Sequence, residues 1–223
     1  MNQLPLFVSV FFIITLGLTL YFLYKAAYDS VYVLIIPLVI IVVQSTLAHN
    51  GFYSHQGQGI PRPLFIILPS LITMVICFIV PQSRHYLLTL NPGWLTFLHV
   101  IRFPIELVLF WLFLYNLVPE IMTFNGWNYD VVSGISAPIV AYYAYVKKSM
   151  PFKWTLIWNI LCLLLLLNIV VIAILSAPTP FQQFAFDHPN TGIFYFPFVC
   201  LPAVIVPLVM LSHIVSIYRL LKD

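Results

Sequence analysis

Long, unbroken apolar runs dominate the pattern of this chain, and short polar connections separate them. The runs are continuous and do not alternate between apolar and polar residues, so they predict membrane-crossing helices and not the strands of an outer-membrane barrel. The predicted spans cover residues 5–24, 31–48, 63–80, 94–116, 130–146, 154–175 and 194–218. We therefore expect an all-α, polytopic integral membrane protein, with a seven-helix transmembrane bundle that forms one domain over residues 1–223.

Composition supports this expectation. Apolar residues make up 62% of the 223 positions, or about 138, and a spanning helix needs about 20 of them. Only 7% of the residues are charged, whereas a soluble domain carries about 25%. So few charges cannot cover a water-exposed surface, which excludes a soluble enzyme, a nucleic-acid-binding protein and a disordered chain. The expected partner is the lipid bilayer.

Basic residues fall almost entirely on one side of the predicted bundle. Arg62 is on the other side, and Arg102 lies inside the fourth span. The residues on the basic-rich side are Lys25, Arg84, Lys147, Lys148, Lys153, Arg219 and Lys222. Because cytoplasmic loops carry an excess of Lys and Arg, the bias predicts a cytoplasmic C-terminus and an N-terminus outside a multi-pass protein of the cell membrane.

Prolines inside the predicted spans indicate kinked helices. Pro37, Pro69, Pro104 and Pro138 lie in the second to fifth spans, and the seventh span contains three more. Each proline removes one backbone hydrogen bond. The freed carbonyl then needs a partner, which a neighbouring helix or a cavity inside the bundle can supply.

The fourth span carries the most informative polar residues. His99, Arg102 and Glu106 are three and four residues apart, so they share one helical face. Ionised groups in hydrocarbon are costly, and Arg102 and Glu106 can partly neutralise each other across one turn. Arg before Glu is the less favourable order in a helix, so we expect a third partner from another helix.

Depth estimates bring further residues into the same layer. At 1.5 Å per residue, Asn159, His213 and Tyr142 lie at a depth comparable to that of His99. The sequence therefore predicts one polar ligand cavity that contains these three residues together with His99, Arg102 and Glu106.

The sequence does not specify a cofactor. His99 and His213 could ligate a haem or a metal from separate helices, but there is no second histidine pair and no C-x-x-C-H or H-E-x-x-H motif. We therefore favour hydrogen-bonded packing histidines and predict no metal site. The segment 194–218 contains no lysine, which excludes a retinal Schiff base.

One stretch is similar to a pattern of the small membrane-bound lycopene cyclases. It comprises Asn91-Pro92, Pro104-Ile105-Glu106 and Leu109-Phe110, about 20 residues in all. Those enzymes have a second acid next to the first, and this chain has Leu107 there. We do not assign the chain to that family; the similarity implies only that an isoprenoid-type enzyme belongs among the candidates.

Three functions follow from the sequence. The first is a non-enzymatic membrane protein that binds or passes a small ligand, ion or proton at the polar site of the fourth span. The second is an intramembrane enzyme that acts on an apolar lipid or isoprenoid. The third is an accessory or structural membrane subunit.

Overall fold

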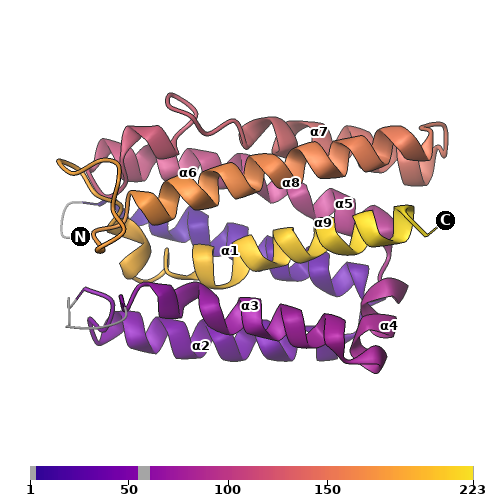
Figure 1. Cartoon of the computed structure of the whole chain (residues 1–223), viewed down its shortest axis with the longest axis horizontal. Coiled ribbons are helices and arrows are strands. Elements are labelled where there is room, and N and C mark those ends of the chain that lie inside the picture. Colours follow the sequence, from indigo (N-terminus) through magenta and orange to yellow (C-terminus); the bar gives the residue numbers. More distant parts are fainter. Residues whose placement is uncertain (1–3, 55–60, 223) are drawn as a thin grey trace.

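The computed structural model describes residues 4–54 and 61–222, and every regular element in these ranges is helical. Helices form a bundle of roughly parallel and antiparallel rods, with the N-terminus and the C-terminus at opposite ends (Figure 1). The α-helices are α1 (Leu6–Ala26), α2 (Ile35–His49), α3 (Leu64–Ile79), α4 (Pro81–Thr89), α5 (Pro92–Leu98), α6 (Arg102–Leu114), α7 (Val131–Ala141), α8 (Phe152–Leu175) and α9 (Val206–Leu220). Short 3₁₀ segments are η1 (Val31–Leu34), η2 (His99–Ile101), η3 (Glu120–Met122) and η5 (Gly192–Phe194), and π-helical segments are η4 (Tyr142–Val146) and η6 (Leu201–Ile205).

Helices occupy all seven predicted segments, but they are not equally suited to cross a membrane. In the part of the chain that the structure describes, five helices are long and apolar enough to do so, and the bent pair α3–α4 would make a sixth. The segment Val131–Val146 is a shorter apolar helix. The architecture is thus that of an all-helical bundle whose helices are compatible with a multi-pass membrane protein.

The connection between the predicted spans 63–80 and 94–116 contains a helix, α4, that the apolar pattern did not predict. Pro81 forces Val80 into an extended conformation, with φ −74° and ψ 117°, and this ends α3. The chain then starts a new helix with Pro81 at its first position, bent by 96° from α3. Hydropathy misses α4 because most of its residues are polar and only Leu87 and Leu90 at its end are buried.

The fourth predicted segment is divided by a change of helix type. Asn91 caps α5 by accepting hydrogen bonds from the backbone N–H groups of Gly93 and Trp94, at 2.9 and 3.2 Å. The helix tightens to 3₁₀ geometry over His99–Ile101, just before Pro104, which has no N–H to donate. Asn91-Pro92 therefore has a local structural role as a helix start.

The seventh predicted segment contains a proline whose missing hydrogen bond is replaced from another helix. In an α-helix the N–H of residue 207 would donate to the carbonyl of Ala203, but residue 207 is a proline and has no N–H. The hydroxyl of Ser70 on α3 donates to this carbonyl. As expected for prolines in a membrane helix, a neighbour supplies the partner.

One end of the bundle gathers the basic residues. The C-terminal ends of α1 and α9 meet α4 and the start of α5 there: Asn91 N–H donates to the Ala26 carbonyl at 2.8 Å, and Arg219 donates to the Leu90 carbonyl at 2.5 Å. In Figure 1 this is the end that carries the C-terminus. We call it the basic end, defined by Lys25, Arg84, Lys147 and Arg219.

Helices α6 and α7 approach closely at Gly134. A Cβ atom at this position would lie 2.5 Å from the backbone nitrogen of Phe103 and 3.1 Å from its Cα. The neighbouring Ser133 and Ala137 are fully buried, and this stripe of small residues is what allows the two backbones to approach. The approach brings the start of α7 against the start of α6.

We predict that Gly134→Ala lowers the free energy of unfolding by about 1–3 kcal/mol, because the new methyl group meets immobile backbone atoms. Gly17→Ala on α1 is the matched control, since a Cβ there has nothing within 4 Å. It should leave stability unchanged or raise it by about 0.5–1 kcal/mol. Thermal midpoints in detergent measure both, and equal midpoints for the two variants would contradict the close approach.

Candidate functional site

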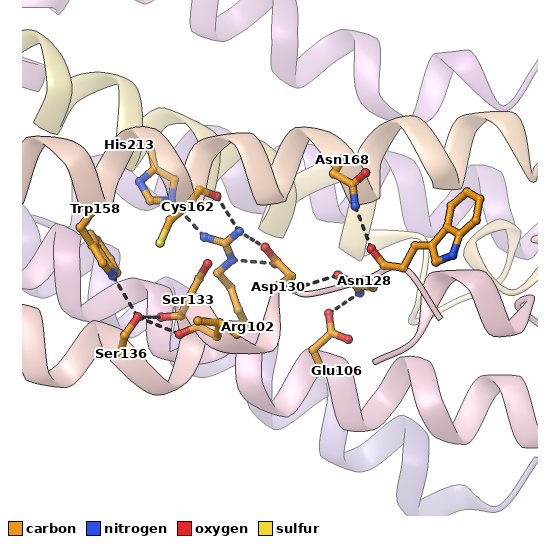
Figure 2. A network of polar contacts seen from close by, with 12 residues as sticks. Arg102, Glu106, Asn128, Asp130, Ser133, Ser136, Trp158, Cys162, Asn168 and His213 are labelled. Atoms are coloured by element: carbon orange, nitrogen blue, oxygen red, sulfur yellow. Dashed lines mark hydrogen bonds and ion pairs between the residues drawn. The ribbon is translucent and has the colours of Figure 1, made fainter. Parts of the chain in front are cut away.

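A buried ion pair lies where α6 meets α7. Arg102 is 3% exposed and begins α6, and Asp130 is 5% exposed and precedes α7. Arg102 Nε donates to Asp130 Oδ2 at 2.6 Å, and Nη2 donates to Oδ1 of the same carboxylate. This two-point geometry, visible in Figure 2, is the strongest arrangement of a guanidinium and a carboxylate.

Two further acceptors complete the surroundings of Arg102. Nη2 also donates to the backbone carbonyl of Cys162 on α8 at 2.9 Å, and Nη1 lies 3.0 Å from Nε2 of His213 on α9. The guanidinium therefore binds groups of three other elements. The expected third partner from another helix is present, and it is Asp130.

The pairing of Arg102 with Glu106 that the spacing suggested is wrong. Within the described residues, the only carboxylate in an ion pair with Arg102 is that of Asp130. The two side chains share a helix face, yet the guanidinium extends towards the start of α7, where both carboxylate oxygens of Asp130 face it. Glu106 thus has no direct ion-pair partner among the described residues, although the charge of Arg102 still acts on it through space.

Hydrogen bonding determines which nitrogen of His213 carries the proton. Arg102 can only donate, so Nε2 of His213 must be the acceptor. Nδ1 then carries the proton and donates to Oδ1 of Asn159 at 3.0 Å. Asn159 is oriented in turn by its Nδ2, which donates to the Thr155 carbonyl at 2.9 Å. His213 is therefore a neutral ring in a fully assigned chain of bonds.

His99 stacks on His213. The ring centroids are 3.8 Å apart with 15° between the planes, and the edge of Trp158 packs on the pair. The Ser212 hydroxyl donates its one proton to the Leu95 carbonyl at 2.8 Å. In the contact of 3.3 Å between Ser212 Oγ and His99 Nε2, the histidine nitrogen is therefore the donor. His99 Nδ1 is buried and has no hydrogen-bond partner among the described residues.

This geometry suits packing histidines better than haem ligands. A metal held between two imidazoles needs room for a bond of about 2 Å to a nitrogen of each ring. The two rings instead lie face to face in direct contact, and their Nε2 atoms already bind Ser212 and Arg102. The described residues contain no group of three or more His, Cys, Asp or Glu side chains placed to hold a metal ion.

Asn128 connects the ion pair to Glu106. Its Nδ2 donates to Glu106 Oε1 at 2.5 Å and to the Met122 carbonyl at 3.0 Å, while its Oδ1 accepts the backbone N–H of Asp130 at 3.1 Å. Figure 2 shows Glu106 beside Asn128, on the side away from Arg102. Glu106 is 2% exposed, and its second oxygen, Oε2, has no hydrogen-bond partner among the described residues.

Glu106 lines a cavity of about 120 Å³, which we call the Glu106 cavity. Helices α3, α6 and α8, the segment around η6 and the loop after α8 form its walls. Every lining residue is apolar except Glu106, Asp130 and Thr179. Glu106, whose Oε2 has no partner among the described residues, is thus one of three polar residues in the lining of an otherwise apolar space.

The structure brings together five of the six residues predicted for the polar cavity. His99, Arg102, Asn159 and His213 form one bonded and stacked cluster, and Glu106 joins it through Asn128 and Asp130. Tyr142 lies apart: it is 51% exposed, and its ring packs edge-on against Tyr143 at 5.4 Å.

Sequence reasoning missed Asp130 and Asn128 as members of this cluster. One weak signal was available. The predicted segment 130–146 is at the lower length limit of a span, so its first residue, Asp130, was a candidate for a place inside the bundle. For Asn128 the sequence offers no comparable signal, because the loop before α7 folds inward only in three dimensions.

Residues 61–221 match the model of a family described as a domain of unknown function, DUF8737. The chain belongs to this family. The matched region contains every residue of the ion pair, the histidine stack and the Glu106 cavity, whereas α1 and α2 precede it. No curated protein and no solved structure matches the chain. The arrangement of this DUF8737 region is therefore the basis for inferring what it does.

We predict that Asp130→Asn destabilises the protein by about 3–5 kcal/mol, because it leaves Arg102 charged and buried without its counter-charge. Glu106→Gln should cost less than about 1 kcal/mol, since its amide oxygen can still accept from Asn128. Asp187→Asn, on an exposed residue, controls for the loss of a carboxylate. Thermal unfolding in detergent ranks the three, and a larger loss for Glu106→Gln than for Asp130→Asn would contradict the pairing.

Proposed function

We propose that this protein binds a small, mainly apolar molecule or group in the Glu106 cavity, with one hydrogen-bond donor of the ligand on Glu106 Oε2. The observation that carries the proposal is that Glu106, a 2% exposed residue with one unpaired carboxylate oxygen, lines an apolar cavity. A buried polar atom without a partner costs free energy, and a ligand donor would remove that cost.

Cavity size and chemistry define the ligand class. A cavity of about 150 Å³ holds benzene, so a space of about 120 Å³ suits an apolar group of about six carbon atoms. Both ionisable groups in the lining, Glu106 and Asp130, are carboxylates, and Asp130 already uses its oxygens on Arg102. The complementary polar group is therefore an alcohol or an amine and not an acid.

The second candidate is an intramembrane enzyme with Glu106 as a general acid or base. It is favoured by the fixed orientation of this side chain: Asn128 holds Oε1 and leaves Oε2 for a reacting group. Chemical conversion of an added ligand would support the enzyme, and recovery of the unchanged ligand would support a binding protein. A protein that binds nothing would support the accessory subunit.

The test uses four probes of equal chain length: 1-hexanol, hexylamine, hexanoate and hexane. We predict that hexanol or hexylamine raises the thermal midpoint of the purified protein, whereas hexanoate does not. Glu106→Gln should weaken this binding by about tenfold, because the amide nitrogen that replaces Oε2 cannot accept the ligand's hydrogen bond. Glu120→Gln is the matched control, because Glu120 is exposed and its carboxylate lies outside the cavity.

A second pair of variants tests whether the probes bind in the Glu106 cavity. Ala173 lines the cavity, so Ala173→Phe should fill it and abolish the response to all four probes. Val171 is on the same helix, is 52% exposed and lies outside the cavity, so Val171→Phe should leave the response intact. Equal responses from both variants, or an equal response to hexanol and hexanoate in the parent protein, would refute the proposal.

We also propose that the protein crosses the cell membrane with its C-terminus in the cytoplasm and its N-terminus outside, seven spans in all. The basic end supports this orientation, because cytoplasmic segments are those rich in Lys and Arg. The bilayer is then its principal partner. The short segment Val131–Val146 would be the fifth span, with its start drawn inward by the ion pair.

We predict the labelling pattern of single cysteines in a Cys77→Ala background, in which the two remaining cysteines are buried. Gln183→Cys, in the loop after α8, should react with a membrane-impermeant maleimide on intact cells. Lys153→Cys, at the start of α8, should react only after permeabilisation. The reverse pattern would overturn the orientation.

A further inference from the structure

A second and larger cavity lies towards the basic end. It measures about 440 Å³, and helices α2, α3, α4 and α9 form most of its wall. Ser70 and Pro207 line this cavity, whereas Ile67 and Val206 on the same two helices line the Glu106 cavity. The hydrogen bond from Ser70 to the Ala203 carbonyl therefore lies between the two cavities. We call the larger cavity the basic-end groove. Most of its remaining wall is apolar and includes Met74 and Leu208.

The groove reaches the outside of the bundle. Three of its lining residues are strongly exposed: Tyr32 is 78% exposed, Ile36 48% and Tyr86 41%. At the depth of α3 and α9 the surroundings of a membrane protein are hydrocarbon, and an unfilled apolar space would forfeit its dispersion contacts. The chemistry of this part of the groove therefore matches an acyl chain.

The wall formed by α4 is different. This helix lies at 96° to α3, and its residues Gln82, Ser83 and Tyr86 add polar groups to the lining. Arg84 lies between them in sequence and is exposed. Arg219 on α9 holds the carbonyl of Leu90, another lining residue. The α4 side of the groove is thus polar, and Arg84 and Arg219 lie beside it without being among the residues that line it.

These two cations have no acidic partner in the described parts of the chain, where the only ion pairs are Lys25–Asp29, at 2.8 Å, and Arg102–Asp130. Guanidinium groups bind phosphate oxygens with strong, charge-assisted hydrogen bonds. An anion at this place would complete the site.

We infer that the basic-end groove binds an anionic phospholipid, with an acyl chain between α2, α3 and α9 and the phosphate at Arg84 on α4. This site is distinct from the Glu106 cavity and does not depend on the function proposed there. A zwitterionic phospholipid fits the apolar part equally well, but its headgroup adds a cation next to Arg84. The groove therefore selects for headgroup charge, while the chain supplies most of the contact area.

Cys77 provides a probe inside the groove. It lines the groove and is partly exposed, whereas Cys162 and Cys200 are buried. In a neutral detergent, added phosphatidylglycerol should slow the alkylation of Cys77 by N-ethylmaleimide. Phosphatidylcholine with the same acyl chains should protect about tenfold less well, as expected for the loss of a charge-assisted contact. A Cys77→Ala variant reports the background reaction.

Two charge variants separate this site from general attraction of lipid to a basic surface. Arg84→Gln should remove the preference for phosphatidylglycerol, because Arg84 is next to the lining residue Ser83. Lys153→Gln should retain it, because Lys153 is an exposed lysine on α8, which contributes no residue to the groove. Native mass spectrometry of the same samples counts the lipids that stay bound.

Three results would overturn the inference. The first is equal protection of Cys77 by the two lipids, and the second is equal loss of preference in Arg84→Gln and Lys153→Gln. The third is phosphatidylglycerol that stays bound without protecting Cys77, which would place the lipid elsewhere on the surface. Arg84 and Lys153 are both exposed, so folding does not confound the comparison between these two charge variants.

Discussion

A guanidinium inside an apolar bundle is the constraint on which the rest of this structure depends. Arginine keeps its charge, so burial is possible only if acceptors surround it. Asp130, the Cys162 carbonyl and His213 supply them from the start of α7, from α8 and from α9. One side chain of α6 thereby ties together the C-terminal half of the bundle.

The same requirement propagates outward from Arg102. His213 must be neutral with its proton on Nδ1, which in turn determines the orientation of Asn159. Asp130 must lie inside the bundle, so the loop before it folds inward and buries Asn128, which then holds Glu106. The free oxygen of Glu106 is thus a consequence of how Arg102 is satisfied and not of any direct contact between the two.

Prolines have the second organising role, because each leaves a carbonyl that another helix can bind. At Pro207 this links α9 to α3 through Ser70, between the two cavities. At Pro81 the break turns α4 across the end of α3 and creates the polar wall of the basic-end groove. Helix breaks therefore shape both spaces.

Much of the fold is readable from the sequence, because hydrophobic runs and proline positions are local signals. The apolar segments and the shared face of His99, Arg102 and Glu106 follow from spacing alone. The pairing of Arg102 with Asp130 does not, since it depends on how deep α7 begins. Tyr142 shows the same limit: its depth was estimated from position, but the face it presents is decided by the π-helical turn at the end of α7. Cavities are still harder to predict from the sequence, because they arise where side chains of several helices do not fill the space between them.

The boundary of the DUF8737 match divides the two cavities unequally. Every residue that lines the Glu106 cavity lies within residues 61–221, whereas α1, η1 and α2 contribute Leu23, Tyr32, Val33, Ile36, Pro37 and Ile40 to the basic-end groove. Removal of α1, η1 and α2 would therefore leave the lining of the first space complete and take six residues from the lining of the second.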